Sequence, residues 1–216
     1  RDFILAHSQG LNRPFPEKKT RMAPDSTTPS TNEFTVNGRT YRPPARPLAV
    51  ICIDGCADEY LDSSLAHERM PRLARLLESG AFRAIARGAL PSFTNVNNSS
   101  ITTGVPPSVH GISGNFFLDP QTGEEVMMNS SSYLRCGTIL AAAARAGRKV
   151  AMVTAKEKLR DILSHELDGI AFSAEKADQA REDTHGISGV EELVGEGVPE
   201  IYSAAASLFV LKAGAA

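Results

Sequence analysis

Three segments of the chain carry residue types that could hold a metal or attack an anionic substrate. In the first, Asp54 follows the apolar residues 48–53 and precedes Gly55. In an open α/β sheet, ligands bind beyond the carboxyl ends of the strands. A carboxylate at this position could therefore present an oxygen to a metal ion or to a basic group of a substrate. A role in capping the next helix or loop accounts for Asp54 equally well.

The second segment, residues 91–98, reads Pro-Ser-Phe-Thr-Asn-Val-Asn-Asn and places Thr94 where a loop meets a predicted helix. A threonine there is typical of an N-cap, which is the structural alternative. The same position suits a nucleophile, because the positive end of the helix dipole and free N–H groups favour an alkoxide and an incoming phosphoryl oxygen. A divalent metal would lower the pKa of the hydroxyl. Asn95, Asn97 and Asn98 would add uncharged donors and acceptors around it.

The third segment, residues 103–117, contains prolines and glycines that predict a long, fixed loop. Within it, Asn115 could direct its amide toward a bound anion. His110 could bind a metal, but the turn residues, valine and isoleucine around it favour a histidine that holds the loop in place.

An alternation of strand and helix patterns would position these segments. Asn37-Gly38, between two β-prone triplets, predicts a hairpin over residues 34–41. Apolar or alternating runs predict strands at residues 48–53, 82–86, 149–153 and 170–172. Helical periodicity and turn signals predict helices over residues 70–77, 95–103, 138–146, 156–165 and 201–211, and a second hairpin over residues 116–128. Strands separated by helices indicate right-handed crossovers. We therefore expect an α/β fold with a mainly parallel sheet flanked by helices.

Composition excludes several classes of protein. The chain has 216 residues, 23 Lys and Arg against 25 Asp and Glu, and a formal net charge of −2. This near-neutral balance gives no electrostatic reason to expect a nucleic acid or a membrane surface as partner. No apolar run approaches the ~18 residues of a membrane span. The three cysteines make no disulfide framework, so we expect a reduced, soluble, cytoplasmic chain, with Cys52 packed in the core.

The N-terminal residues differ in composition from the rest. Residues 1–31 are rich in proline, serine and threonine and predict a disordered tail. Because the chain opens with Arg1 and has an internal Met22, upstream read-through explains this segment as well as a natural tail does. A hairpin and a proline-rich linker are expected over residues 32–47, followed by folded structure over residues 48–216.

The motifs resemble those of the phosphonoacetate hydrolase family. This family belongs to the alkaline phosphatase superfamily and is similar to the nucleotide pyrophosphatase/phosphodiesterases within it. The matching motifs are residues 51–55 (Ile-Cys-Ile-Asp-Gly), 91–98, 103–117, 154–160 (Thr-Ala-Lys-Glu-Lys-Leu-Arg) and 172–178 (Phe-Ser-Ala-Glu-Lys-Ala-Asp). The similarity extends over residues 35–213, and residues 48–216 would form the N-terminal part of an alkaline-phosphatase-like catalytic domain.

The resemblance implies an activity and a set of site residues. The family hydrolyses the carbon–phosphorus bond of phosphonoacetate, giving acetate and phosphate, at a site with two zinc ions. Asp54 would be a zinc ligand, and Thr94 would be the nucleophile bound to the same zinc. Asn115 would hold a phosphoryl oxygen, and Lys156 and Lys158 would receive the substrate carboxylate. Without the resemblance, these lysines would be interpreted as a solvated first helical turn. The complete enzyme is a candidate homodimer with a small-molecule phosphonate as its substrate.

Most of the expected metal ligands have no counterpart here. Two zinc ions need roughly six protein ligands, and the resemblance implies a later Asp-x-x-x-His, an Asp-His dipeptide and a final His. The chain has five histidines and no Asp-His dipeptide, and we interpret Asp161 and His165 as a pair on a helix face. We therefore expect an incomplete catalytic domain that is inactive on its own. A phosphodiesterase or nucleotide pyrophosphatase of the same superfamily, and a non-catalytic fragment, remain the alternatives.

Overall fold

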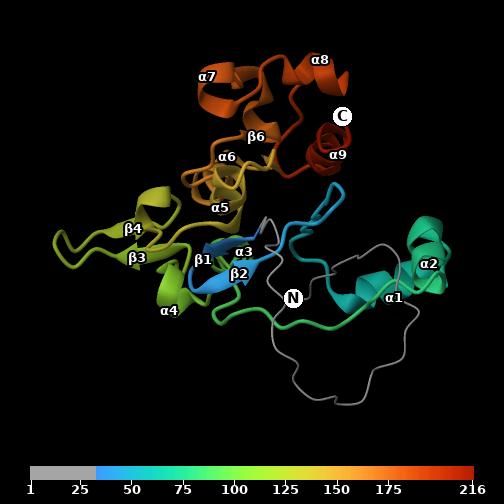
Figure 1. Ribbon diagram of the computed structural model, residues 1–216, viewed down its shortest axis with the longest axis horizontal. Coiled ribbons are helices and arrows are strands. Elements are labelled where there is room, and N and C mark those ends of the chain that lie inside the picture. Colours follow the sequence, from blue (N-terminus) through green and yellow to red (C-terminus); the bar gives the residue numbers. More distant parts are fainter. Residues whose placement is uncertain (1–32) are drawn as a thin grey trace, which may run out of the picture. The chain divides into compact units, whose positions relative to one another are not determined.

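The computed structural model describes residues 33–216 (Figure 1). They form two compact units. The smaller unit is Pro44–Gly88, and the larger unit comprises residues 33–43 together with Ala89–Ala216. The expected disordered tail, residues 1–31, lies outside the described residues. None of the helices in the described part combines the length and apolar character that crossing a bilayer requires.

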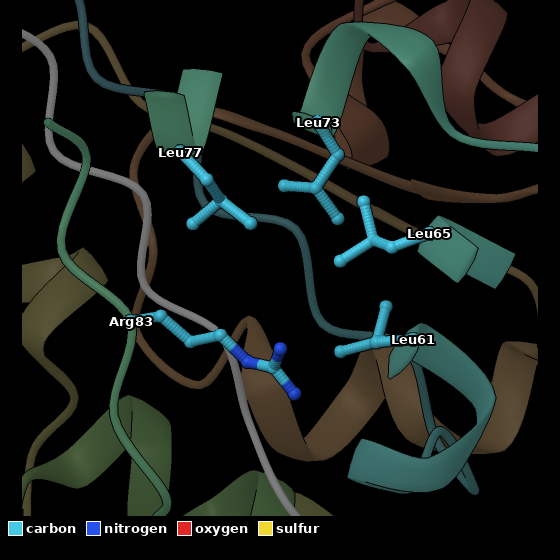
Figure 2. Close-up of a pocket in the computed structure, with 5 residues that line it drawn as sticks. All are labelled: Leu61, Leu65, Leu73, Leu77 and Arg83. Atoms are coloured by element: carbon cyan, nitrogen blue, oxygen red, sulfur yellow. The ribbon is translucent and has the colours of Figure 1, made fainter. Parts of the chain in front are cut away.

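The smaller unit is built from helices α1 (Asp58–Ala66) and α2 (Pro71–Glu78). The helix predicted over residues 70–77 is confirmed, and Pro71 suits its first position because proline lacks the N–H that would be unsatisfied there. Leucines of both helices and Arg83 line a small apolar cavity (Figure 2). The Arg83 guanidinium lies 2.7 Å from a carboxylate oxygen of Asp58 and 2.7 Å from one of Asp62. These ion pairs hold the segment after α2 against α1.

The strands predicted at residues 48–53 and 82–86 are wrong. Both segments are without strand pairing in the smaller unit, and their apolar side chains are largely exposed, Ile51 by 58% and Ile85 by 75%. A strand needs a neighbour that bonds its N–H and C=O groups, and neither segment forms a strand ladder within the described residues. Cys52 is exposed as well, which corrects the expectation that it packs in the core.

The larger unit contains three two-stranded sheets (Figure 1). Two are antiparallel hairpins and one is a parallel pair. The strands are β1 (Phe34–Val36) with β2 (Arg39–Tyr41), β3 (Phe116–Leu118) with β4 (Glu125–Met127), and β5 (Ala151–Thr154) with β6 (Ile170–Ser173). Both predicted hairpins are confirmed. In the β5–β6 pair, Ala151 lies opposite Ile170 and Thr154 opposite Ser173. Among the described residues, the expected parallel sheet is represented by this pair alone.

Seven α-helices and two 3₁₀ segments complete the described part of the larger unit. They are α3 (Thr94–Thr103), α4 (Pro107–His110), α5 (Ile139–Arg145), α6 (Glu157–Leu163), α7 (Glu182–His185), α8 (Val190–Val194), α9 (Ala204–Ala213), η1 (Ser131–Tyr133) and η2 (Ala174–Gln179). Thr138 and Ser203 cap α5 and α9 by accepting hydrogen bonds from backbone N–H groups of the first turn. Gly104 ends α3 at φ 69°, where a Cβ would collide with the Tyr41 hydroxyl. The helices predicted in this unit are confirmed.

Two apolar clusters hold the larger unit together. The first joins the second hairpin and η1 to the β5–α6 unit through Ile112, Met128, Leu134, Met152, Ile162, Leu163 and Ala171. The second packs β6 and η2 against the C-terminal helices through Phe172, Ala174, Ala177, Ala180, Val190 and Phe209. The first cluster contains residues of α6, which lines the pocket described below, and both clusters contain residues of β6.

The turn of the first hairpin also ties two helices together. Asn37 and Gly38 both have positive φ, 52° and 74°, as a tight two-residue turn requires. The Nδ2 of Asn37 donates hydrogen bonds of 2.8 Å to the carbonyl of Thr103, at the end of α3, and of 2.8 Å to the carbonyl of Gly137, just before α5. The hairpin thereby satisfies carbonyls that would otherwise need another donor.

Candidate active site

A pocket of about 170 Å³ lies in the larger unit, where α3, the β3–β4 hairpin and α6 meet. Its lining residues are Thr94, Asn95, Asn115, Phe116, Met127, Asn129, Lys156, Lys158 and Leu159. The pocket therefore brings together five of the residues singled out in the sequence, namely Thr94, Asn95, Asn115, Lys156 and Lys158. Two of its lining side chains are lysines, and no carboxylate of the described residues lines it. This charge distribution suits an anionic ligand.

Thr94 is the first residue of α3 and is half-buried. The N-cap is Phe93, whose backbone is extended at φ −84° and ψ 155°, so the interpretation of Thr94 as the N-cap is wrong by one residue. The side chain of Thr94 lines the pocket at the end of α3 that carries the positive end of the helix dipole.

Two of the neighbouring asparagines hold the backbone around Thr94. The Asn97 side chain accepts a 2.7 Å hydrogen bond from the N–H of Ala89 and donates a 3.3 Å bond to the carbonyl of Phe93. Asn98 donates to the carbonyl of Thr94 at 3.0 Å. Of the three amides expected to add donors and acceptors around Thr94, only that of Asn95 lines the pocket, which corrects the expectation for Asn97 and Asn98.

Asn95 connects α3 to the second hairpin. Its side chain is buried, and its Nδ2 donates a 2.7 Å hydrogen bond to the carbonyl of Met128. The N–H of Met128 in turn donates to the carbonyl of Asn115 at 2.7 Å. This chain of bonds fixes Thr94 and Asn115 on the same pocket.

Asn115 presents an unsatisfied polar atom at the pocket. Its Oδ1 is buried and has no hydrogen-bond partner among residues 33–216. An unsatisfied buried polar atom costs about 1–3 kcal/mol. A half-turn of the amide exchanges Oδ1 with the Nδ2 donor group. A ligand with an acceptor or a donor at this place would remove that cost.

Lys156 and Lys158 stand at the start of α6. Lys156 is the N-cap and is half-buried, whereas Lys158 is exposed in the first turn. Neither lysine forms an ion pair with a carboxylate elsewhere in the described part of the chain. Both are therefore available to an anionic ligand in the pocket without competition from a described carboxylate.

The carboxylates beside these lysines have other partners. Glu157 accepts a 2.7 Å hydrogen bond from Arg160 and a 2.6 Å bond from the Ser173 hydroxyl. Glu175 accepts a 2.7 Å bond from the N–H of Glu157. Burial alone would raise the pKa of Glu157, but the bonds from Arg160 and Ser173, together with nearby positive charges, outweigh it and lower that pKa. The network anchors the start of α6 on the end of β6.

His110 holds the loop before Asn115, as the sequence predicts. Its ring is fully buried, its Nδ1 accepts a 3.1 Å bond from the N–H of Ile112, and its Nε2 lies 2.9 Å from the Ser100 hydroxyl. Because Nδ1 accepts, the neutral ring carries its proton on Nε2 and donates to Ser100. Burial lowers the pKa of His110.

The described residues do not by themselves make a metal site. Within residues 33–216, no three His, Cys, Asp or Glu side chains gather in an arrangement that could hold an ion. Asp54 is exposed in the smaller unit, whereas Thr94 belongs to the larger unit, so the expected sharing of one zinc by these two residues stays a prediction. Asp161 accepts a 2.6 Å bond from the N–H of Ser131. His165 lies beyond the end of α6 at Leu163, so the interpretation of Asp161 and His165 as a pair on a helix face is wrong.

Several residues line the pocket that the sequence patterns did not indicate. Phe116, Met127, Asn129 and Leu159 also line it. The ring of Tyr202 lies 4.2 Å from the Nζ of Lys156, measured to the ring centroid. No local pattern could have indicated this contact, because it depends on how the segment before α9 packs. The sequence does offer one signal. Ser173 follows a predicted strand, and the ends of parallel strands carry ligand-binding groups, so polar residues near Ser173 are candidates for the site.

Comparison with known proteins places these features in a family. The family model for type I phosphodiesterase/nucleotide pyrophosphatase matches residues 48–184. Crystal structures of phosphonoacetate hydrolase from Sinorhizobium meliloti 1021, in complex with phosphonoformate and with phosphonoacetate, match with a TM-score of 0.78 and 46% identity over 86% of this chain. The mixed α/β fold of this chain thus matches that of a phosphonoacetate hydrolase.

Relatives of other activities match over shorter segments. An uncharacterized pyrophosphatase/phosphodiesterase of Schizosaccharomyces pombe is 36% identical over 78 residues, 36% of this chain. An ectonucleotide pyrophosphatase/phosphodiesterase of Caenorhabditis elegans is 31% identical over 81 residues, 38% of this chain. The chain covers 46% of the solved hydrolase chain, and 15% and 10% of these two relatives. Since the family model matches more than half of its residues, the chain belongs to the type I phosphodiesterase/nucleotide pyrophosphatase family of metal-dependent hydrolases.

Proposed function

We propose that this chain carries the substrate-binding and nucleophile-bearing part of a phosphonoacetate hydrolase. The observation that carries the proposal is the pocket in which Thr94, Asn115, Lys156 and Lys158 meet and to which no described residue contributes a carboxylate. The solved relatives support it, because they are described in complex with phosphonoacetate and phosphonoformate. Each of those ligands has a phosphonate at one end and a carboxylate at the other.

The two ends of such a ligand would bind different sides of the pocket. The carboxylate would lie against Lys156 and Lys158, whose ammonium groups are without a carboxylate partner among the described residues. The phosphonate would lie between the start of α3 and Asn115, where the helix dipole and the amide favour negative charge. This orientation directs the phosphorus toward the Thr94 hydroxyl.

Attack by Thr94 then accounts for cleavage of the carbon–phosphorus bond. An O–P bond forms to Thr94 as the P–C bond breaks, and the electron pair of that bond passes to the methylene carbon. The carbon takes up a proton, equivalent to the one lost by the hydroxyl, and leaves as acetate. Water then hydrolyses the phosphothreonine and releases phosphate. Lys156 and Lys158 would stabilise the charge that develops on the departing acetate unit.

Metal binding by the complete protein is part of the proposal, with zinc as the expected ion. Bound zinc would lower the pKa of an alcohol and polarise the phosphonate. Asp54 and Thr94 are the ligands that this chain would contribute. Two ligands do not hold two metal ions, so every role assigned above is one that the chain's own residues perform.

A second candidate is hydrolysis of a phosphodiester or pyrophosphate, because the matched family and the two curated relatives carry that description. This reaction would give Thr94 and Asn115 the same roles. Its substrate does not require a carboxylate, so it does not explain two lysines placed to bind one. The lysine pair in the pocket therefore favours the phosphonate with a carboxylate.

A binding experiment distinguishes the two candidates. Phosphonoacetate and methylphosphonate, which lacks the carboxylate, would be titrated into the full chain and into the Lys156→Ala/Lys158→Ala variant, with binding followed by NMR. We expect the variant to lose the preference for phosphonoacetate and to keep its affinity for methylphosphonate. Lys149→Ala, at an exposed lysine outside the pocket, is the matched control. Equal preference in wild type and variant would contradict the proposal.

A further inference from the structure

Tyr202 has two features that packing does not explain. Its side chain is 74% exposed, so it contributes little to the core. Its backbone lies in the left-handed region at φ 65°, which is uncommon for a bulky residue that is not glycine. A conformation of this kind persists where the surrounding structure holds it, and such residues gather at functional positions. Tyr202 precedes α9, on a segment remote in sequence from the pocket.

The ring of Tyr202 is directed at the ammonium group of Lys156. The Nζ of Lys156 lies 4.2 Å from the centroid of the ring, within the distance over which an aromatic face attracts a cation. An ammonium group has three N–H donors. A ring face occupies one side of the group and cannot neutralise its charge, so the other side remains available to an anion in the pocket.

The surroundings of Lys156 show why a ring is suited to this place. The nearby carboxylates of Glu157 and Glu175 accept hydrogen bonds from Arg160, from Ser173 and from the backbone. A carboxylate at the place of the ring would hold Lys156 equally well, but it would compete with the carboxylate of a ligand. An aromatic ring positions the long lysine side chain without that competition.

We infer that Tyr202 is a positioning residue, which holds the ammonium group of Lys156 toward the pocket and so favours ligands that carry a carboxylate. The inference rests on the proposed function, in which Lys156 receives that carboxylate. Tyr202 is not among the residues that line the pocket, so it acts through Lys156 rather than on the ligand.

Three substitutions at Tyr202 separate the ring from the backbone. Tyr202→Phe keeps the ring, Tyr202→Leu removes it with the strained backbone retained, and Tyr202→Gly removes it while suiting the positive φ. We expect Tyr202→Leu and Tyr202→Gly to bind phosphonoacetate about two- to fivefold more weakly, the range for an exposed cation–π contact. Methylphosphonate affinity should stay unchanged in all three, and Tyr202→Phe should stay within about twofold of wild type for both ligands.

A second measurement detects the contact between the Tyr202 ring and the Lys156 side chain directly. A ring current shields protons above the ring face, so the ε-methylene protons of Lys156 should shift upfield in the wild type and in Tyr202→Phe. The shift should vanish in Tyr202→Leu and Tyr202→Gly. Tyr60→Leu, at another exposed tyrosine, in the smaller unit, should change neither the shift nor the affinities.

The outcomes separate this inference from the proposed function. If Lys156→Ala lowers phosphonoacetate affinity while Tyr202→Leu does not, the role of Tyr202 is overturned and the proposed function stands. If Tyr202→Phe behaves like Tyr202→Leu, the ring is not the cause and the inference is wrong. If Lys156→Ala leaves the affinity unchanged, the proposed function fails, and the inference fails with it.

Discussion

The Nδ2 of Asn95 donates a 2.7 Å hydrogen bond to the carbonyl of Met128. Through it, the helix that begins at Thr94 is joined to the residue whose N–H bonds the carbonyl of Asn115. Thr94, the proposed nucleophile, and Asn115, the amide proposed to hold the phosphonate, are thus positioned by one buried connection rather than by two independent loops.

Asn95→Ala should therefore affect both stability and ligand binding. Removing the amide leaves the buried carbonyl of Met128 without its donor, which costs about 1–3 kcal/mol of unfolding free energy. Urea unfolding of the full chain measures this loss, and NMR titration should show weaker binding of methylphosphonate as well as phosphonoacetate. Gln121→Ala, at an exposed amide in the second hairpin turn, is the control. A variant as stable as the control would contradict the role given to Asn95.

Asn37 should contribute in two separable ways. Asn37→Gly suits the positive φ but loses the bonds to Thr103 and Gly137, and we expect it to cost about 1–2 kcal/mol. Asn37→Ala loses the same bonds and also strains the turn, so it should cost about 1 kcal/mol more. Thermal or urea unfolding of both variants gives the comparison. Equal stability of the Ala and Gly variants would show that the turn conformation does not matter.

His110 should make stability depend on pH on the acidic side of neutrality. Its pKa in the folded chain lies below 6.5, the ordinary value for a histidine, so the unfolded chain takes up the proton first. The contribution of neutral His110 to the free energy of unfolding is therefore fully present above about pH 6.5. It decreases as pH falls toward the pKa of His110 in the folded chain. Urea unfolding between pH 7.5 and pH 5 should show this decrease, and His110→Gln should reduce it. An identical slope in both proteins would contradict the assignment.

Glu157 should make stability depend on pH in a more acidic range than His110 does. Its pKa lies below 4.5, the ordinary value for a glutamate, so its contribution to stability is present above that value and is lost as pH falls through the lower pKa of the folded chain. Glu157→Gln should cost about 1–3 kcal/mol near neutral pH, because the charge-assisted bonds from Arg160 and Ser173 weaken. Unfolding at pH 7 and pH 3.5 tests this, since the difference between variant and wild type should shrink in acid. A difference that stays constant would point to packing instead.

The sequence indicates local structure well where a short pattern suffices. Asn37-Gly38 predicts its hairpin because both residues tolerate positive φ. Gly104 ends α3 for the same reason. The local patterns predict Thr94 and Asn115 as site residues, the family resemblance adds Lys156 and Lys158, and all four line one pocket. Patterns of a few residues carry this information because the physical requirement is itself local.

Features that depend on distant partners could not be predicted in this way. Residues 48–53 have the apolar pattern of a buried strand, yet they form no strand ladder within the described residues. The side chains of Asn97 and Glu157 satisfy backbone and side-chain groups brought close by packing. Tyr202 reaches Lys156 only because the segment before α9 packs beside α6. Such contacts are set by tertiary structure, and residue spacing does not encode them.

We propose above that the pocket binds the phosphonate and the carboxylate of one ligand at opposite sides, with the phosphorus beside Thr94. A crystal structure of this protein with phosphonoacetate tests it most directly. We expect the ligand carboxylate to contact the ammonium groups of Lys156 and Lys158. We expect the phosphorus to face the Thr94 Oγ1, with Asn115 in contact with a phosphonate oxygen. A ligand bound in the reverse orientation, or bound outside this pocket, would contradict it.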